Sequence, residues 1–383
     1  EYTKELKKRL PRSYFQPVPS RLFWLVPHLA VIAGCIWALV ALDLSVWAKL
    51  AASLLIGLSF SALGFLAHEV LHGSVVKSPL VRDAVGALCF APFLLGPKIW
   101  RKWHNVEHHG HTQGDQDPDA MGTLEDFHNR RGVRALYSLH PQLRSLVTFA
   151  AFSFWFTFHA FLMLLRLYPE LGRRERAVAT LQFALPASGW ALFGIGFGWD
   201  AFCYGYLIPH LVANFVVMSY IATNHMLNPL TPVNDPLANS LTVIKPRWID
   251  VLHLNFSHHT EHHVFPAMNP KYAPKVKALM KELWPERYHE MPHWRALLAL
   301  WRTPRLYRNE SELADPKRKL AYPVLGRGLE AGRVTAVPYS DGEAPAAGST
   351  RAQAARHGEA RRAEGAAAPG GEPAHVRPVT AER

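Results

Sequence analysis

Cysteine is scarce in this sequence, with three residues in a chain of 383. Cys35, Cys89 and Cys203 all lie in apolar runs, and their spacing forms neither a disulfide framework nor a paired zinc-binding pattern. Disulfide-stapled folds and cysteine-ligated zinc domains are therefore excluded. We expect the three thiols to be small packing residues.

Sequence signatures of several other protein classes are also missing. The chain has no glycine-rich nucleotide-binding loop and no His-Pro-Gly-Gly haem motif. It has no motif that reads a nucleic-acid groove, although its formal charge is +12. No secretory signal is visible, because the first 21 residues are polar and basic and no small-residue cleavage pattern follows. We therefore interpret the positive charge as membrane topology information and lipid contact.

What the chain has instead is long apolar runs bounded by aromatic residues. A helix needs about 20 apolar residues to cross a bilayer, and four stretches of roughly that length carry no charged residue. Many of the 12 Trp, 20 Phe and 12 Tyr lie near the ends of the apolar runs, as in an interfacial belt. The predicted spans are residues 23–42, 50–67, 177–199 and 201–223.

Two further apolar runs are not predicted to cross. Residues 84–97 are too few to span and are expected to lie at the interface or re-enter. Residues 145–165 are as apolar as the spans, but a crossing there would put the histidine clusters described below on opposite faces. It would also strand four arginines outside, against the positive-inside rule. These arginines are Arg166, Arg173, Arg174 and Arg176.

These choices predict an all-α integral membrane protein with four transmembrane helices, re-entrant or interfacial helices and a cytoplasmic helical cap at residues 224–334. The basic segment 1–22 and the histidine clusters would lie on the cytoplasmic side, in a bacterial plasma membrane. The outside turns, near Asp43 and Asp200, carry almost no positive charge. The membrane domain would cover residues 23–334, and residues 335–383 have the composition of a disordered tail.

Three clusters stand out among the 21 histidines. In the first two, histidines four residues apart would share one face of a helix, so both imidazoles could point at the same metal. The second and third clusters each contain adjacent histidines. The clusters are His68 and His72; His104, His108 and His109; and His258, His259, His262 and His263.

The number of histidines favours a pair of metal ions. Eight or nine imidazoles exceed what one tetrahedral zinc ion binds, and imidazole also suits iron, copper and nickel. Iron is the one of these with the dioxygen chemistry to attack an unactivated C–H bond. A structural role is disfavoured, because polar groups crowded at a membrane boundary are costly unless they serve a site. His28, His159 and His210 stand alone and are expected to be structural, while His289 and His293 are expected at the surface.

A zinc protease is an alternative interpretation of the first cluster. The run His68-Glu69-Val70-Leu71-His72 matches the His-Glu-x-x-His motif, in which the glutamate is a general base. An intramembrane protease would carry this motif inside a span, whereas here it lies at the end of one. The protease hypothesis gives the other two clusters no role, and it predicts one zinc ion per chain.

Taken together, the clusters resemble the three histidine boxes of the membrane fatty acid desaturase family, over roughly residues 20–310. The third box fits either His258 or His259 together with His262 and His263, and we choose His259. The resemblance also implies a further metal ligand near the end of the last span, where His225 stands.

The resemblance implies a non-haem diiron oxidoreductase. Such an enzyme uses two Fe ions, dioxygen and two external electrons to remove two hydrogens from neighbouring methylenes of an acyl-lipid or acyl-thioester substrate. Since no haem or nucleotide motif is visible, a ferredoxin, rubredoxin or cytochrome b5-like carrier is expected to dock on the basic cap. Lipid hydroxylases and ketolases of the same fold have similar boxes and remain alternatives. No catalytic residue beyond the metal ligands is predicted.

Residues beside the boxes have two interpretations each. Glu69, Glu107 and Glu261 could orient imidazoles through their free nitrogens or pair with basic residues facing solvent. Some relatives use an asparagine, through water, one turn before the last-span histidine, but this chain has isoleucine there. Asn224 or Asn228 could substitute for it.

An acidic loop and two tryptophans lie close to the second box. Asp115, Asp117 and Asp119 alternate with Gln and Pro. They could steady the box histidines or bind a cation, but loops of this composition are commonly turns, and we predict a turn. Trp100 and Trp103 could line an acyl channel or anchor the chain at the membrane interface, and we predict the anchor.

Overall fold

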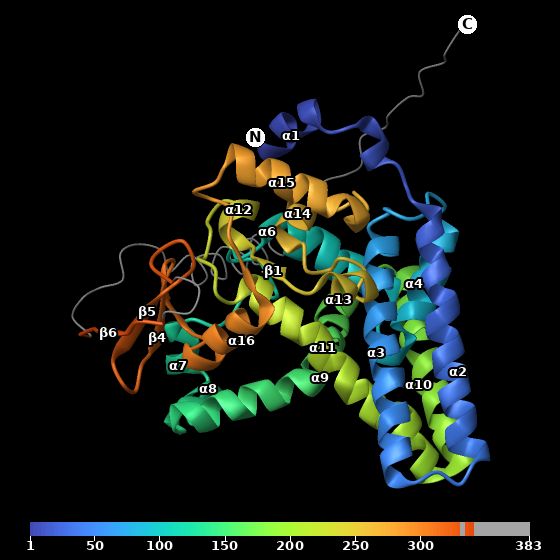
Figure 1. The fold of residues 1–383 in the computed structure, drawn as a ribbon. Helices are drawn as coiled ribbons and strands as arrows, with labels where there is room; N and C mark the ends of the chain where they lie inside the picture. Colours follow the sequence, from blue (N-terminus) through green and yellow to red (C-terminus); the bar gives the residue numbers. More distant parts are fainter. Residues whose placement is uncertain (330–333, 341–383) are drawn as a thin grey trace, which may run out of the picture. The chain divides into compact units, whose positions relative to one another are not determined.

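The computed structural model describes residues 1–329 and 334–340, and most of them are helical (Figure 1). By length and composition, the described residues contain four helical stretches that could cross a membrane. These are Pro19–Ala41, Val46–Leu71, Pro141–Glu170 and Arg173–His225.

The first two spans form a helical hairpin. Helices α2 (Leu25–Ala41) and α3 (Val46–Leu71) lie side by side in Figure 1, close to the predicted 23–42 and 50–67. The Ser45 hydroxyl caps α3 by accepting a hydrogen bond from Ala48 N (3.3 Å). The second half of α3 is almost wholly buried, because the other helices pack around it.

A second hairpin corresponds to the predicted spans 177–199 and 201–223. Helix α10 (Arg173–Phe202) leads through a π-helical turn, η6 (Cys203–Leu207), into α11 (Ile208–His225). The chain reverses near Gly198, whose φ of +88° suits glycine alone among the residues. Trp190 and Tyr206 then stack across the hairpin, with ring centroids 4.3 Å apart. The long helical stretch is therefore two helices, α10 and α11, joined by a reversal of the chain.

The two hairpins turn at the same end of the molecule. Lys49 Nζ at the start of α3 lies 2.6 Å from Asp200 Oδ2 beside the second turn. Ser53 Oγ, one turn further along α3, donates to Tyr204 O (2.7 Å). The opposite ends of α3 and α11 carry His68 and His225. Both hairpins therefore bring their histidines to one side.

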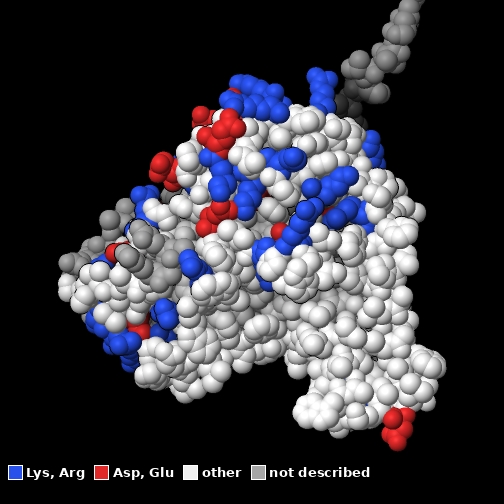
Figure 2. All heavy atoms as spheres, in the orientation of Figure 1, with Lys and Arg blue, Asp and Glu red and all other residues white. Residues whose placement is uncertain are grey.

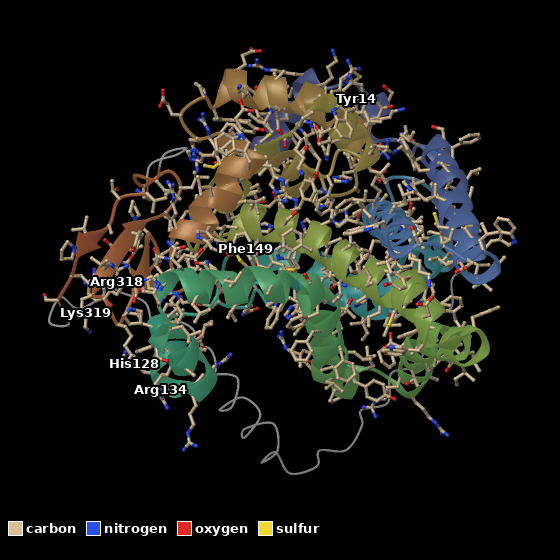
Figure 3. The ribbon with its side chains drawn as sticks, turned by 60° about the horizontal axis from the view of Figure 1, so that its bottom comes forward. Tyr14, His128, Arg134, Phe149, Arg318 and Lys319 are labelled. Carbon is tan, nitrogen blue, oxygen red and sulfur yellow. The ribbon has the colours of Figure 1, made fainter. Side chains whose placement is uncertain are left out.

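Helix α9 (Pro141–Leu167) packs against α11 and lies at a steep angle to α2 and α3 in Figure 1. Figure 3, which brings the lower end forward, shows Phe149 on α9; its ring lies 5.1 Å from that of Trp301 in the cap. Helix α9 is itself long and apolar enough to span, so the prediction that residues 145–165 do not cross stays a prediction.

The predicted interfacial run 84–97 lies in a broken helical pair. Helix α4 (Pro79–Phe90) with the 3-10 turn η3 (Ala91–Phe93) meets the next helical stretch at an angle of 98°. Leu94, at the break, has a φ of +53°. The stretch after the break comprises α5 (Pro97–Trp100), the π-helix η4 (Arg101–His108) and α6 (His109–His111).

The cap covers the histidine-bearing ends of the spans. The N-terminal segment packs onto it through buried Leu6 and through Phe15, whose ring lies 5.2 Å from Phe265. The remaining helical elements are α1 (Tyr2–Arg9), η1 (Arg12–Phe15), η2 (Pro19–Trp24), α7 (Leu124–Asn129), α8 (Arg131–Ser138) and η5 (Tyr168–Glu170), and in the cap α12 (Pro236–Asn239), α13 (Arg247–Leu252), α14 (His259–Val264), η7 (Pro270–Tyr272), α15 (Ala273–Leu283) and α16 (His293–Arg302).

The cap also contains short strands, which the sequence did not predict. A parallel pair aligns Thr242 with Glu290, and an antiparallel sheet has the order β3-β4-β5-β6. Arg318 and Lys319 lie in this sheet region, away from α2 and α3 in Figure 3. The predicted tail begins at residue 335, and only residues 335–340 of it are described; 341–383 lie outside the described residues. The strands are β1 (Thr242–Ile244), β2 (Glu290–Pro292), β3 (Tyr307–Asn309), β4 (Glu312–Asp315), β5 (Leu320–Pro323) and β6 (Val337–Pro338).

Candidate metal centre

Nine histidines from four parts of the chain meet beneath the cap. They come from the end of α3, from η4 and α6, from the end of α11, and from α14. They form two groups, and within each group the candidate ligand nitrogens all lie within 4.8 Å of one another. The first group is His68, His72, His104, His109 and His262, and the second is His108, His225, His259 and His263.

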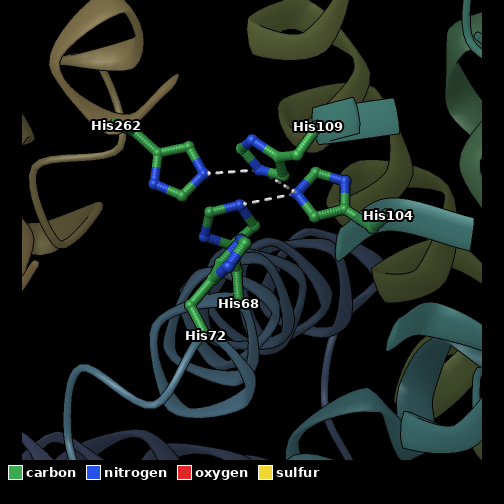
Figure 4. A group of neighbouring side chains, drawn as sticks. All are labelled: His68, His72, His104, His109 and His262. Carbon is green, nitrogen blue, oxygen red and sulfur yellow. Dashed lines mark hydrogen bonds between the residues drawn. The ribbon is translucent and has the colours of Figure 1, made fainter. Parts of the chain in front are cut away.

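The first group converges on one point, as Figure 4 shows. His104 Nε2 lies 3.1 Å from His68 Nε2 and 3.2 Å from His109 Nε2, and His262 Nε2 lies 3.0 Å from His109 Nε2. His72 Nε2 is buried and has no hydrogen-bond partner in the described part of the chain. A neutral imidazole carries one N–H, so facing nitrogens cannot all satisfy one another. A cation bound at their centre would satisfy them.

The nitrogens of the second group also face one another at short distances. His259 Nε2 lies 2.7 Å from His225 Nε2 and 3.1 Å from His263 Nε2. The ring of His108 lies 4.9 Å from that of His225 and 5.2 Å from that of His263. Four imidazoles thus face a second common point beside the first.

A π-helix determines which group each histidine of the second box joins. The sequence predicted that His104 and His108 share a face, which is true of an α-helix. The two rings do stack, with centroids 5.1 Å apart, and their nitrogens lie within 4.8 Å of one another and of an Asp119 oxygen. However, η4 (Arg101–His108) is a π-helix, in which residues five apart are hydrogen-bonded along the chain, so His104 also joins His109 in the first group while His108 enters the second. In α14, which is α-helical, His259 and His263 keep the four-residue spacing.

The outer nitrogens of the second group are held by protein oxygens. His225 Nδ1 donates to Asn239 O (3.0 Å), and His263 Nδ1 donates to Thr112 Oγ1 (3.3 Å). Such contacts fix the tautomer and leave Nε2 to face a metal. The sequence did not indicate either partner, because both are small polar groups far from the boxes along the chain.

Burial keeps the imidazoles of the second and third boxes neutral, apart from that of His108. Desolvation lowers the pKa of all of them, with nearby imidazoles adding to the effect, well below the ordinary histidine value. The neutral ring is the form that binds metal. The histidines concerned are His104, His109, His259, His262 and His263.

The acidic loop contacts a histidine of the second box, so it does more than form the predicted turn. Asp117 is buried, and its Oδ1 accepts a hydrogen bond from His108 Nδ1 (3.0 Å). Burial lowers the pKa of His108, but Asp117 and Asp119 outweigh this effect and raise the pKa to about 9. Asp119 Oδ1 also accepts from Trp103 Nε1 (2.8 Å) and from His159 Nε2 (2.9 Å). The loop thus supports a ligand and ties it to α9.

An apolar cavity lies against both histidine groups. Trp100 and Trp103 line it and are buried, so the prediction that they anchor the chain at the membrane interface was wrong. The histidines and Asp119 form one wall, and the rest is hydrocarbon or aromatic. The cavity is lined by Gly64, Phe65, Phe90, Trp100, Trp103, Phe156, Val217, Ile221 and Phe256, with His68, His104, His108, Asp119, His225 and His259.

Glu69 faces away from the histidine groups. Its carboxylate accepts hydrogen bonds from Arg21 Nε (3.0 Å) and Asn269 Nδ2 (3.2 Å). Arg21 Nη2 also donates to Leu254 O (3.2 Å), so the pair joins the N-terminal segment to the cap. A carboxylate held in this way cannot act as the general base of a zinc protease, which removes the structural support for that alternative.

The other two glutamates also have partners other than the nine histidines. Glu107 lies 3.3 Å from Arg166, which fits the interpretation as a partner of a basic residue. Glu261 is buried and accepts from Thr242 Oγ1 (2.7 Å) and from the Tyr288 hydroxyl. The role that the sequence suggested for these glutamates, orienting box imidazoles, is thus taken by Asp117.

Asn224 and Asn228 are buried beside the end of α11. Neither side-chain polar atom of Asn224 has a hydrogen-bond partner within the described residues, and the same holds for Oδ1 of Asn228. Asn228 Nδ2 donates to Asn224 O (3.4 Å). Each amide therefore has capacity for a water molecule.

Other histidines lie outside the two groups. His258 Nε2 lies 3.6 Å from Asp250, so the structure brings His259 to the centre and leaves its neighbour out. His293 was expected at the surface, but it is 6% exposed and donates to Ser219 O (3.0 Å). His293 lies at the start of α16, on the side of the helix that is buried.

Comparison with known proteins agrees with the histidine arrangement. Residues 45–295 match the protein-family model described as fatty acid desaturase. The chain is 27% identical over 269 residues to an omega-6 fatty acid desaturase, chloroplastic, of Spinacia oleracea, a match that covers 66% of this chain and 58% of that protein.

Two cyanobacterial proteins named sn-1 oleoyl-lipid 12-desaturase also match. The protein of Synechocystis sp. is 26% identical over 249 residues, which cover 60% of this chain and 68% of that protein. The protein of Picosynechococcus sp. is 24% identical over 332 residues, which cover 79% of this chain and 89% of that protein. The match spans less than two thirds of the spinach protein and most of the Picosynechococcus one.

Proposed function

Because this chain belongs to the fatty acid desaturase family, we propose that it is an oxygen-dependent oxidoreductase that introduces a C=C bond into a fatty acyl chain. The observation that carries the proposal is the apolar cavity whose wall is made by both histidine groups. The cavity measures about 40 Å³, and the methylene groups of an acyl chain that enter it would lie directly against the metal centre. The apolar helices and the family identify an integral membrane protein.

The donor set fits two iron ions. The nine imidazoles offer five nitrogens to one ion and four to the other, and the unpartnered His72 Nε2 already faces the first point. Bound iron would supply the dioxygen chemistry and electron transfer for C–H removal. The protein holds the ligands through Asp117, Thr112 and Asn239 and keeps the reacting methylenes among aromatic side chains, away from water.

The substrate we propose is an acyl lipid in the membrane. The names of the cyanobacterial relatives specify an oleoyl lipid, so a lipid-bound oleoyl chain is the first substrate to test. An acyl thioester would have to bring its charged carrier to the cap. It is therefore the second substrate to test.

Electrons would come from a separate carrier that docks on the basic face of the cap. Figure 2 shows Lys and Arg gathered over the cap, with an acidic residue at the opposite end of the molecule. Because α1 packs on α15, exposed lysines and arginines of these helices and of the short turns η1 and η7 next to them form one surface. An acidic ferredoxin, rubredoxin or cytochrome b5-like protein would be attracted there. The residues are Lys4, Lys7, Lys8, Arg9, Arg12, Lys271, Lys275 and Lys281.

The same charge distribution supports a cytoplasmic metal centre, which we place on the inner face of a bacterial plasma membrane. Positive residues are retained on the cytoplasmic side, and here they lie on the histidine side of the spans.

The proposal can be tested by expressing the chain with a reductase and ferredoxin in a host with a simple lipid composition. Mass spectrometry of the lipids should show acyl chains lighter by two hydrogens, and the purified protein should hold about two iron ions per chain. Addition of an oxygen atom would identify a hydroxylase or ketolase instead. One zinc ion with no iron, and no new lipid, would refute the proposal.

A further inference from the structure

A second hollow opens on the membrane-facing side of the protein, between α9, α10 and the break after η3. It is a crevice of about 320 Å³, lined mostly by aromatic side chains. Three of them, Phe154, Phe158 and Phe161 of α9, are between 39% and 47% exposed. Because these helices lie among the candidate spans, the surroundings of the crevice are lipid chains and not water.

One buried ring separates this crevice from the cavity at the metal centre. Phe93 is fully buried, and its ring centroid lies 5.3 Å from that of Phe156, which lines the inner cavity. It lies 6.4 Å from His210, which lines the crevice. A Cβ on Gly64, another residue of the inner cavity, would lie 3.0 Å from the Phe93 ring. Phe93 thus touches the walls of both hollows.

The backbone around Phe93 is fixed by hydrogen bonds. His210 Nδ1 donates to Pro92 O (2.9 Å), which joins α11 to η3. Asn214 Oδ1 accepts from Thr157 N (2.9 Å), which joins α11 to α9. The three helical elements are therefore held in place by these hydrogen bonds.

The two hollows lie at different distances from His225 along α11. At the helical rise, Val217 of the inner cavity lies about 12 Å from His225, and His210 of the crevice lies about 22 Å from it. An acyl chain that passes the histidine groups and continues along α11 would meet the Phe93 and Phe156 rings and then the crevice. The far end is apolar apart from His210 and Thr157, and His210 is already paired.

We propose that the crevice receives the methyl end of the substrate's acyl chain, and that Phe93 and Phe156 form a movable partition that limits how much chain extends beyond the reacting carbons. This inference rests on the proposed function. A polar head group would be poorly accommodated so deep in an aromatic crevice, because unpaired polar groups are costly there. The occupant is therefore the hydrocarbon end of the substrate lipid.

The test compares acyl lipids of different chain length as competing substrates. Phe93→Ala should join the two hollows and raise the ratio of long-chain to short-chain product about tenfold, since one extra methylene in a pocket discriminates by that order. Thr157→Phe, which fills the crevice, should lower the ratio. The matched control is Phe152→Ala, a buried phenylalanine on the same helix that lines neither hollow.

The two variants are expected to move the ratio in opposite directions, which a general loss of stability would not do. An unchanged ratio in both, with desaturation intact, would show that the crevice holds a bystander lipid and would overturn the inference. If Phe93→Ala fails to fold, Phe156→Leu opens the same partition from α9, and an unchanged ratio there has the same meaning. Absence of any desaturated product from the unmodified chain would instead count against the proposed function.

Discussion

Adjacent histidines in the third box have different environments. His259 belongs to the second group, with Nε2 2.7 Å from His225 Nε2, whereas His258 faces Asp250. We expect His259→Ala to lose one of the two iron ions and about a hundredfold or more of product formation, because a direct ligand matters at least as much as its outer partner. His258→Ala should keep both irons. Iron analysis of the purified variants and lipid mass spectrometry would measure this, and equal behaviour of the two variants would contradict the assignment.

The acidic loop gives a second matched pair. Asp117 is buried and accepts from His108 Nδ1, while Asp115 is exposed two residues earlier. Asp117→Asn keeps the shape but removes the charge that holds the imidazole, so iron affinity should fall about 10-fold to 100-fold. Asp115→Asn should leave the affinity unchanged. Titration of the metal-free protein with ferrous iron would measure both, and full affinity in Asp117→Asn would show that the contact is incidental.

The candidate ligand histidines could be predicted from the sequence because their spacing is a local property, whereas the acidic loop was only one possible support and a turn was preferred. His68 with His72, and His259 with His263, lie four residues apart in helices. Asp117 approaches His108 only because the loop after α6 folds back under the box. The pairing of His104 with His109 depends on a π-helix, for which the sequence carries no comparable periodic signal.

Helices α3 and α11 form the frame that holds the first and last histidines, and glycine lets them approach closely. A Cβ on Gly57 would lie 2.7 Å from Val212 Cβ and 2.8 Å from Pro209 O. Gly57→Ala should therefore cost about 1–3 kcal/mol by overpacking.

Gly34 in α2 provides the control, because a Cβ there would have no neighbour within 4 Å. Gly34→Ala should stabilise the protein by about 0.5–1 kcal/mol, as alanine favours a helix over glycine. Thermal unfolding of the detergent-solubilised variants would show shifts of opposite sign. A loss of stability in both would mean that helix packing at Gly57 is not the cause.

The elements themselves were predicted to different degrees. Long apolar runs indicated α2, α3, α10 and α11, since nothing but a membrane explains such composition in a helix. The 98° break after η3 and the short strands of the cap depend on contacts between distant segments. That residues 145–165 do not cross was predicted only indirectly, from the requirement that the histidine clusters meet on one side, and it stays a prediction.

The molecule as a whole is polarised along the span axis. Asp200 lies at the turn of both hairpins, and Lys281 lies on α15 in the cap. In a variant lacking Cys35, Cys89 and Cys203, an Asp200→Cys substitution should react with a membrane-impermeant maleimide added to intact cells. Lys281→Cys should react only in inside-out vesicles, because positive residues remain in the cytoplasm. Labelling of both sites from one side would refute the topology on which the metal centre depends.

The histidines that converge beneath the cap are spread from His68 to His263 along the chain. During synthesis, α14 leaves the ribosome after every crossing has been made, so no earlier fragment holds either full set of nitrogens. Iron would therefore bind after the chain has folded, and it would stabilise the fold by joining the four parts of the chain that carry the histidines. Its removal would loosen the ends of α3 and α11, the second box and α14 together.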